Sequence, residues 1–137
     1  MAQEDLFKAI EISGSGLRAE WVRMQVIANN LANADTTETP EGGPYRRQHA
    51  VFATVLNEMN GVQVRGIVSS NAPPRMVFNP GHPDANAEGF VAMPNVEPPE
   101  EMVDMLMASR AYEANLAAMR NFRQICEETI KLLRPSS

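Results

Sequence analysis

The sequence predicts a mainly α-helical fold with a small β-rich insert. Three features of the 137-residue chain lead to this prediction. One apolar stripe with seven-residue spacing lies near the N-terminus, and a second lies near the C-terminus. Between them, residues 35–99 hold nine of the ten prolines and six of the eight glycines, so no long helix can form there. We therefore expect one long helix at each end of the chain.

The N-terminal helix is expected over residues 4–33. Its apolar face is widened by Trp21 and is interrupted at residues 13–16 (Ser-Gly-Ser-Gly). Each glycine inside a helix costs about 1 kcal/mol relative to alanine. We expect this part of the helix to be marginal until packed, and its small residues to let another backbone approach closely. The seven-residue stripe consists of Ile10, Leu17, Met24 and Leu31.

The C-terminal helix is expected to begin after Pro98 and Pro99, where a missing N–H costs nothing. Acidic residues in its first turns suit the positive end of the helix dipole, and Pro135 is expected to end the helix. Its seven-residue series is Met105, Tyr112, Met119, Cys126 and Leu133. A second apolar line consists of Met102, Leu116 and Ile130. Such periodicity at both ends predicts coiled-coil-like packing of the two helices as a pair, with packing against other subunits as the alternative.

The middle segment is expected to contain short strands. Strand-like runs occupy residues 47–56, 62–69, 75–78 and 89–92, and Asn60-Gly61 is typical of a hairpin turn. So few strands make an insert too small for a robust core of its own. The predicted organisation is one discontinuous helical domain, formed by residues 1–34 and 100–137, with a loop and β insert at 35–99.

Composition and charge argue against several classes of protein. The formal net charge of −5 gives little support to nucleic-acid binding. No apolar run approaches the ~18 residues of a transmembrane helix, so we expect no direct membrane insertion. The N-terminus lacks the apolar core of a cleavable signal peptide. Cys126 is the only cysteine, so no internal disulfide is expected.

The sequence predicts neither an enzyme nor a cofactor or metal site. His82, Asp84 and Glu88 lie close together in sequence, and such side chains can hold a divalent ion. Their spacing matches no known ligand pattern, however, so we expect a loop without a metal. Cys126 falls on the apolar helix stripe, and we expect it to pack rather than react.

The candidate functional residues are therefore those that pack the two helices and set their register. Asparagines at the end of the first helix can cap that helix or bond a neighbouring one, and both interpretations stay open. Asn30 and Asn33 flank Leu31, where hydrogen bonds would fix the register between helices. The predicted packing residues are Leu17, Met24, Leu31, Met105, Tyr112 and Met119. The predicted residues for register and inter-subunit polar contacts are Asn30, Asn33 and Arg110.

Motifs at the two ends of the chain resemble the axial family of bacterial flagellar proteins, which build the rod and hook. The first covers residues 27–37 (IANNLANADTT) and is followed by Tyr45-Arg46-Arg47. The second covers residues 102–105 (MVDM) and 109–115 (SRAYEAN). Two further segments, 39–47 and 80–96, are similar to those of proximal rod subunits.

This resemblance implies a non-enzymatic structural subunit of the proximal rod. Such a subunit would assemble through its terminal helices into a helical tube that transmits torque and houses the export channel. It would leave the cell by the flagellar type III route without a cleavable signal and lie in the periplasm-spanning basal body. The implied partners are other proximal rod proteins, neighbouring copies, the rod-base adaptor or export gate, and the surrounding rings. The alternative is a cytosolic helical adaptor or export chaperone.

Overall fold

The computed structural model describes residues 2–54 and 61–133, with only the backbone described for residues 2–6. It confirms the predicted fold class: two long helices stand at the ends of the chain, and a small β-containing segment lies between them in the sequence. The elements in chain order are α1 (Ala2–Ala32), β1 (Gln48–Thr54), β2 (Val62–Ser69), β3 (Arg75–Phe78), β4 (Phe90–Met93) and α2 (Pro98–Leu133). The division into domains stays a prediction.

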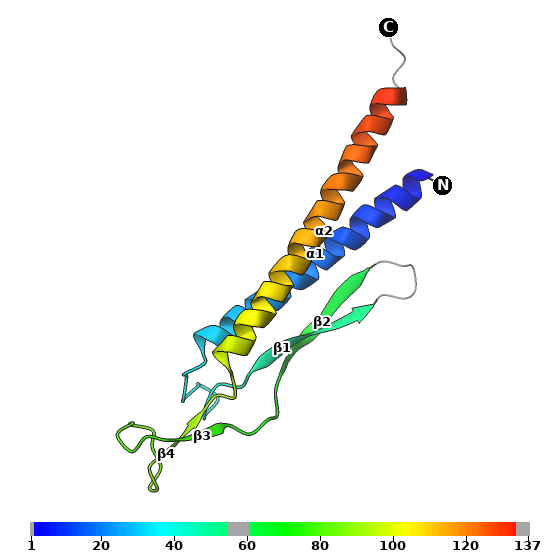
Figure 1. Cartoon of the computed structure of the whole chain (residues 1–137). Coiled ribbons are helices and arrows are strands. Elements are labelled where there is room, and N and C mark those ends of the chain that lie inside the picture. The colour runs from blue at the N-terminus through cyan, green and yellow to red at the C-terminus, as the bar shows by residue number, and fades with distance from the viewer. Residues whose placement is uncertain (1, 55–60, 134–137) are drawn as a thin grey trace.

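The helices α1 and α2 form an antiparallel pair, with the start of α1 and the end of α2 at the same end of the molecule (Figure 1). Asn30 near the end of α1 contacts Glu101 near the start of α2. Further along, Gly16 faces Asn115. The predicted pairing of the terminal helices is therefore present within one chain.

The seam of α2, the side of this helix that packs against α1, differs in part from the predicted one. Glu101 and Ala108 are the buried residues of this helix, and they alternate at spacings of three and four with the half-buried Met105 and Tyr112. The second apolar line is wrong at two of its three positions, because Met102 is 62% exposed and Ile130 is 56% exposed, whereas Leu116 is half-buried. The small and polar residues Glu101, Ala108 and Asn115 take its place beside the main series.

The helix α1 packs on two sides, against α2 and against the strands β1 and β2 (Figure 1). Two-sided contact widens the buried face beyond a single seven-residue stripe. The buried apolar residues of α1 are Ala19, Val26 and Ile27, whereas the predicted stripe residues are only half-buried. Trp21 does not widen this face as expected, since it is 54% exposed.

The strands form two separate antiparallel ribbons. In the first, β1 pairs with β2 from Gln48–Ser69 to Thr54–Val62, with a register shift between Val51 and Phe52. The predicted turn at Asn60-Gly61 falls partly in residues 55–60, outside the described residues. In the second ribbon, β3 pairs with β4, and Phe78 and Phe90 meet edge to face across it.

Residues 13–16 of α1 show why small side chains stand at this point. A Cβ atom added at Gly16 would lie 2.9 Å from Nδ2 of Asn115 on α2. One added at Gly14 would lie 3.4 Å from Cε of Met119, which is ordinary contact. Glycine at position 16 therefore allows the close approach of α2 that the sequence indicated.

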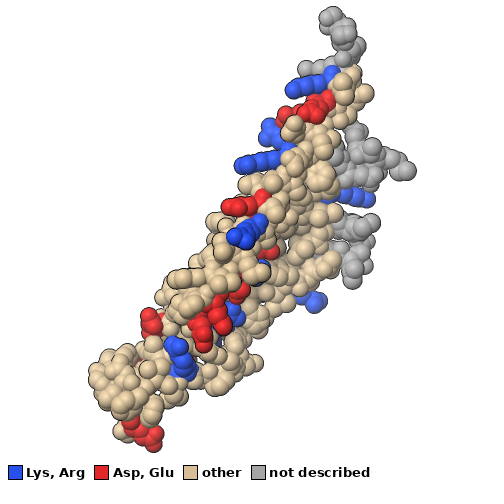
Figure 2. Space-filling view, viewed as in Figure 1, with Lys and Arg blue, Asp and Glu red and all other residues tan. Residues whose placement is uncertain are grey.

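Figure 2 shows acidic and basic side chains interspersed along the visible face, rather than one large patch of a single sign. Within residues 2–54 and 61–133, no helix is both long and apolar enough to cross a membrane.

Gly16→Val is expected to lower the free energy of unfolding by about 1–3 kcal/mol, because the added methyl groups would press on Asn115. Gly14→Val is the matched control and is expected to be nearly neutral, since valine has a better helix propensity than glycine and there is room for its Cβ. Urea unfolding of the purified chain, followed by circular dichroism, measures both. Equal losses at the two positions would contradict close packing at Gly16.

Candidate functional site

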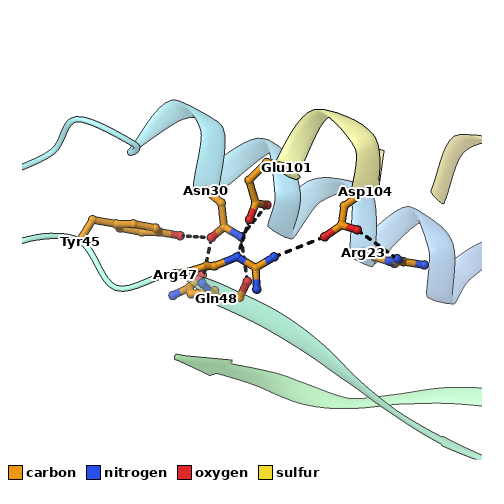
Figure 3. Close-up of polar contacts among 7 residues, drawn as sticks. All are labelled: Arg23, Asn30, Tyr45, Arg47, Gln48, Glu101 and Asp104. Atoms are coloured by element: carbon orange, nitrogen blue, oxygen red, sulfur yellow. Dashed lines mark hydrogen bonds and ion pairs between the residues drawn. The ribbon is translucent and has the colours of Figure 1, made fainter. Parts of the chain in front are cut away.

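A polar cluster joins three parts of the chain near the end of α1 (Figure 3). Its central residue is Asn30, which is 1% exposed. The Nδ2 group of Asn30 donates to the carbonyl oxygen of Gln48 at 2.8 Å and to Oε2 of Glu101 at 3.1 Å. Its Oδ1 atom accepts from the N–H of Gln48 and from the hydroxyl of Tyr45, both at 2.9 Å. The two donor and two acceptor positions of this amide are thus all used.

Glu101 contributes a buried carboxylate to the cluster. Its side chain is 1% exposed, yet it stands in the first turn of α2, where the helix dipole favours a negative charge. The guanidinium of Arg47 donates from Nε to Oε1 of Glu101, and this ion pair offsets the cost of removing the charge from water. Because Asn30 binds the other carboxylate oxygen, both oxygens of Glu101 have a partner inside the chain.

Arg47 extends the cluster towards solvent. Its Nη2 group donates to Oδ2 of Asp104 at 3.3 Å, and Oδ1 of Asp104 lies 4.0 Å from Nη2 of Arg23 on α1 (Figure 3). The side chains of Arg23, Arg47 and Asp104 are each about one-third exposed. These outer contacts are therefore weaker than the Arg47–Glu101 pair, since water screens them.

Tyr45 closes the cluster on the side of the loop that leads into β1. Burial raises the pKa of the Tyr45 phenol above its ordinary value, and the nearby Glu101 carboxylate raises it further. Both effects favour the protonated phenol, which is the form that donates to Asn30.

Asn33 has a different set of contacts. Its Nδ2 group donates to the carbonyl oxygen of Asn29 at 2.9 Å, and its Oδ1 accepts from the hydroxyl of Thr36 at 3.2 Å. It therefore helps to end its own helix, one of the two roles left open by the sequence. Contacts of Asn33 with another subunit stay a prediction, as do those of Arg110, which is exposed.

The structure places the six predicted packing residues at half-buried positions on the two helices. Met119 is brought next to Gly14 of the opposite helix. The half-buried residues are Leu17, Met24 and Leu31 on α1 and Met105, Tyr112 and Met119 on α2. Their part in assembly stays a prediction.

Sequence reasoning missed the connecting residues of the cluster. In the sequence, Glu101 and Asp104 are among the acidic residues that suit a helix start, and Tyr45 and Arg47 belong to a motif, but no pattern connects the four. One signal was present: Glu101 lies four residues before Met105 and seven before Ala108. That spacing puts a carboxylate on the seam of the helix, where only a partner charge makes it tolerable.

The loop at residues 79–89 does not bring a metal-ligating set together. His82 Nδ1 accepts from the N–H of Asp84 at 3.1 Å, and Oδ2 of Asp84 accepts from the hydroxyl of Thr37 at 2.7 Å. Among the residues that the structure describes, no three His, Cys, Asp or Glu side chains cluster as metal ligands would. Cys126 is half-buried on α2.

Comparison with known proteins gives matches at both ends of the chain. Residues 10–38 match the family described as flagella basal body rod protein, and residues 87–132 match the C-terminal family of the flagellar basal body rod FlgEFG proteins. The hydrogen bond between Asn30 and Glu101 joins these two matched segments.

Several relatives match over most of their length. The flagellar basal-body rod protein FlgC of Borreliella burgdorferi is 37% identical, over 94% of this chain and 98% of the relative. FlgC of Yersinia enterocolitica is 41% identical over 93% of this chain and 97% of the relative. FlgC of Bacillus subtilis is 41% identical over 82% of this chain and 88% of the relative.

Arg47→Met is expected to lower the free energy of unfolding by about 3–5 kcal/mol, because Glu101 is left buried without a partner charge. Adding Glu101→Leu is expected to restore much of this loss, since the unpaired charge is then gone. Arg123→Met is the control: it breaks an exposed pair with Glu127 and should change stability by less than about 1 kcal/mol. A loss at Arg47 no larger than at Arg123 would show that the buried pair does not hold the fold.

Stability is expected to fall as the pH rises above about 10, because the Tyr45 phenol ionises later in the folded chain than in the unfolded chain. Over that range the unfolded state binds fewer protons than the folded state, so a rising pH favours unfolding; below it, the contribution of Tyr45 is fully present. Tyr45→Phe is expected to remove this part of the pH dependence. Urea unfolding of both chains between about pH 8 and pH 11 measures it. The same alkaline slope in both chains would contradict a raised pKa of Tyr45.

Proposed function

Because this chain belongs to the FlgC family of flagellar basal-body rod proteins and is a structural subunit of the rod, we propose that it builds the proximal part of that rod. In this proposal the terminal helices pack with those of neighbouring subunits into a helical tube, which transmits torque and houses the export channel. A cytosolic helical adaptor or export chaperone is not favoured, because the relatives named above are rod proteins and this chain matches most of the length of each.

The outward face of α2 is the observation that best supports packing between subunits. Met102, Val103, Leu106 and Met107 are between 54% and 62% exposed, and they lie together on the first turns of the helix. Isolated apolar residues on a surface are ordinary, but an adjacent group of this kind is typical of a surface that another protein covers. We propose that a helix of a neighbouring rod subunit covers it.

The nine candidate residues belong to the same proposal. Leu17, Met24, Leu31, Met105, Tyr112 and Met119 are only half-buried in the single chain, so further burial is available to them in the rod. Asn33 and Arg110 would supply polar contacts at the edges of the packed helices, and Asn30 would set the register through the cluster that it centres.

The last turns of α2 support a second part of the proposal, that contacts with neighbouring subunits order the ends of the helices. Ile125, Leu132 and Leu133 are between 52% and 86% exposed. A helical segment of about a dozen residues is marginal in water without tertiary packing. We propose that both terminal helices become fully ordered only in the rod, which suits passage of the chain through a narrow export channel.

The proposed partners are other proximal rod proteins, neighbouring copies, the adaptor or export gate at the rod base, and the surrounding rings. The proposed location is the periplasm-spanning rod, reached by type III export without a cleavable signal. The role requires no catalytic group. The relatives are rod proteins, which supports the proposal that this chain is not an enzyme.

Leu106→Asp is expected to abolish incorporation of the protein into basal bodies and to abolish motility, because it places a charge in the proposed interface. The fold of the single chain should be unaffected, since Leu106 is 54% exposed. Asn121→Asp adds the same charge at an exposed polar position of α2 and should be incorporated normally. Immunoblots of purified basal bodies and swimming assays measure both variants. Normal incorporation of the Leu106→Asp chain would refute this interface.

A further inference from the structure

The hairpin formed by β1 and β2 is held to α1 near its far end by Ser15. The N–H of Val62, the first residue of β2, donates to Oγ of Ser15 at 3.0 Å. The same hydroxyl donates to the carbonyl oxygen of Ile12 at 2.7 Å, so its position is fixed by α1 itself. Ser15 is 6% exposed, and this contact is therefore shielded from water.

Gly61 allows this close approach. Its φ of +84° lies in the left-handed region, and a Cβ atom there would lie 2.1 Å from Oγ of Ser15. Any other residue would strain the backbone at this φ and would displace either the Ser15 hydroxyl or the hairpin. The backbone at Gly61 and the hydroxyl of Ser15 thus form a fitted contact.

The other end of the hairpin is held by Asn30. Its amide exchanges two hydrogen bonds with the backbone N–H and carbonyl of Gln48, the first residue of β1. A side-chain amide here takes the place that a neighbouring strand would take. The hairpin is therefore attached to α1 at both ends by a side chain that binds the first residue of a strand.

The two attachment points are about as far apart on α1 as they are on the hairpin. Ser15 and Asn30 are fifteen residues apart on α1, a rise of about 22 Å. Gln48 and Thr54, the partner of Val62, are six residues apart on β1, a rise of about 20 Å. The hairpin can therefore lie along α1 with both contacts made, and Figure 1 shows it running beside that helix.

The position of the Ser15 attachment is also the weakest part of α1. Gly14 and Gly16 flank Ser15, and glycine makes a helix easier to deform. We propose that Ser15 and Asn30 fasten the hairpin to α1 as a splint, which keeps this helix straight across its glycine segment when the rod carries torque. The proposal rests on the function proposed above and adds to it a device inside each subunit.

Hydrogen exchange of the purified chain tests the attachment itself. In Ser15→Ala, the amide of Val62 is expected to exchange roughly two- to tenfold faster, since one hydrogen bond that protects it is lost. The amide of Gln48, held by Asn30, should be unchanged and serves as the internal control. Ser109→Ala, a serine-to-alanine change on α2, should leave both amides unchanged. An unaltered rate at Val62 in Ser15→Ala would overturn the proposal.

Motility under load tests the role of the splint. Cells with Ser15→Ala are expected to incorporate the subunit into basal bodies at the normal level, to swim normally in dilute medium, and to lose rotation in viscous medium. Val62→Pro removes the same hydrogen bond from the side of the hairpin, at the first position of a strand, where proline is tolerated. It gives a second chain with the same expected result if Ser15→Ala does not fold.

The outcomes separate the two proposals. Absence of the unaltered subunit from basal bodies would refute the proposed function. Normal incorporation of both variants, with unchanged rotation at high load, would overturn the splint alone and leave the function in place.

Discussion

The fold depends on the burial of one carboxylate. Glu101 is 1% exposed, and a charge in such surroundings is tolerated only when a partner charge and hydrogen-bond donors surround it. Its partners, Asn30 and Arg47, come from α1 and from the residue before β1, so the charge is satisfied only when three parts of the chain are in place together. Helices rich in Met and Ala can pack in several registers at similar cost, because these side chains are small or flexible. The Glu101 cluster therefore selects one arrangement that apolar contacts alone would leave open.

The second constraint is that α1 has neighbours on two sides. A helix between α2 and the hairpin needs small residues where each neighbour comes close, and residues 13–16 supply them: Ser15 towards the hairpin, Gly16 towards α2. The cost of glycine in a helix is offset here by contacts that a larger residue would prevent. The small residues at 13–16, which weaken the isolated helix, are thus the ones that allow its contacts with α2 and with the hairpin.

The periodic parts of the chain could be predicted from the sequence, and the contacts between distant parts could not. The helices and all four strands were predicted within a few residues, because seven-residue and alternating patterns are local. The main series on α2 lies on the side towards α1 from Met105 to Cys126, whereas its last member, Leu133, is 76% exposed. Met102 and Ile130 were not recognised as outward-facing, since the period alone does not show which of two apolar faces a neighbour covers. Asn30 was predicted to set the register, and the structure places it at the centre of the polar cluster. Its partners Tyr45, Gln48 and Glu101 were not connected to it, because they lie 15, 18 and 71 residues away and contacts at such separations leave no local pattern.

The shape of the molecule follows from the same constraints and bears on what surrounds it. The helix α2 has 36 residues and is about 54 Å long. A compact domain of this chain length has a radius of gyration of only about 14 Å, so the helix is far longer than such a domain is wide. A chain so extended cannot cover both faces of its helices, and α1 covers only one face of α2. Met102 and Leu106 lie on the other face, on the same turns as Glu101, where the polar cluster has already fixed the orientation of the helix. The buried charge therefore has two effects: it holds α2 against α1, and it fixes the direction of the apolar face of α2, which is the face proposed above to contact a neighbouring subunit.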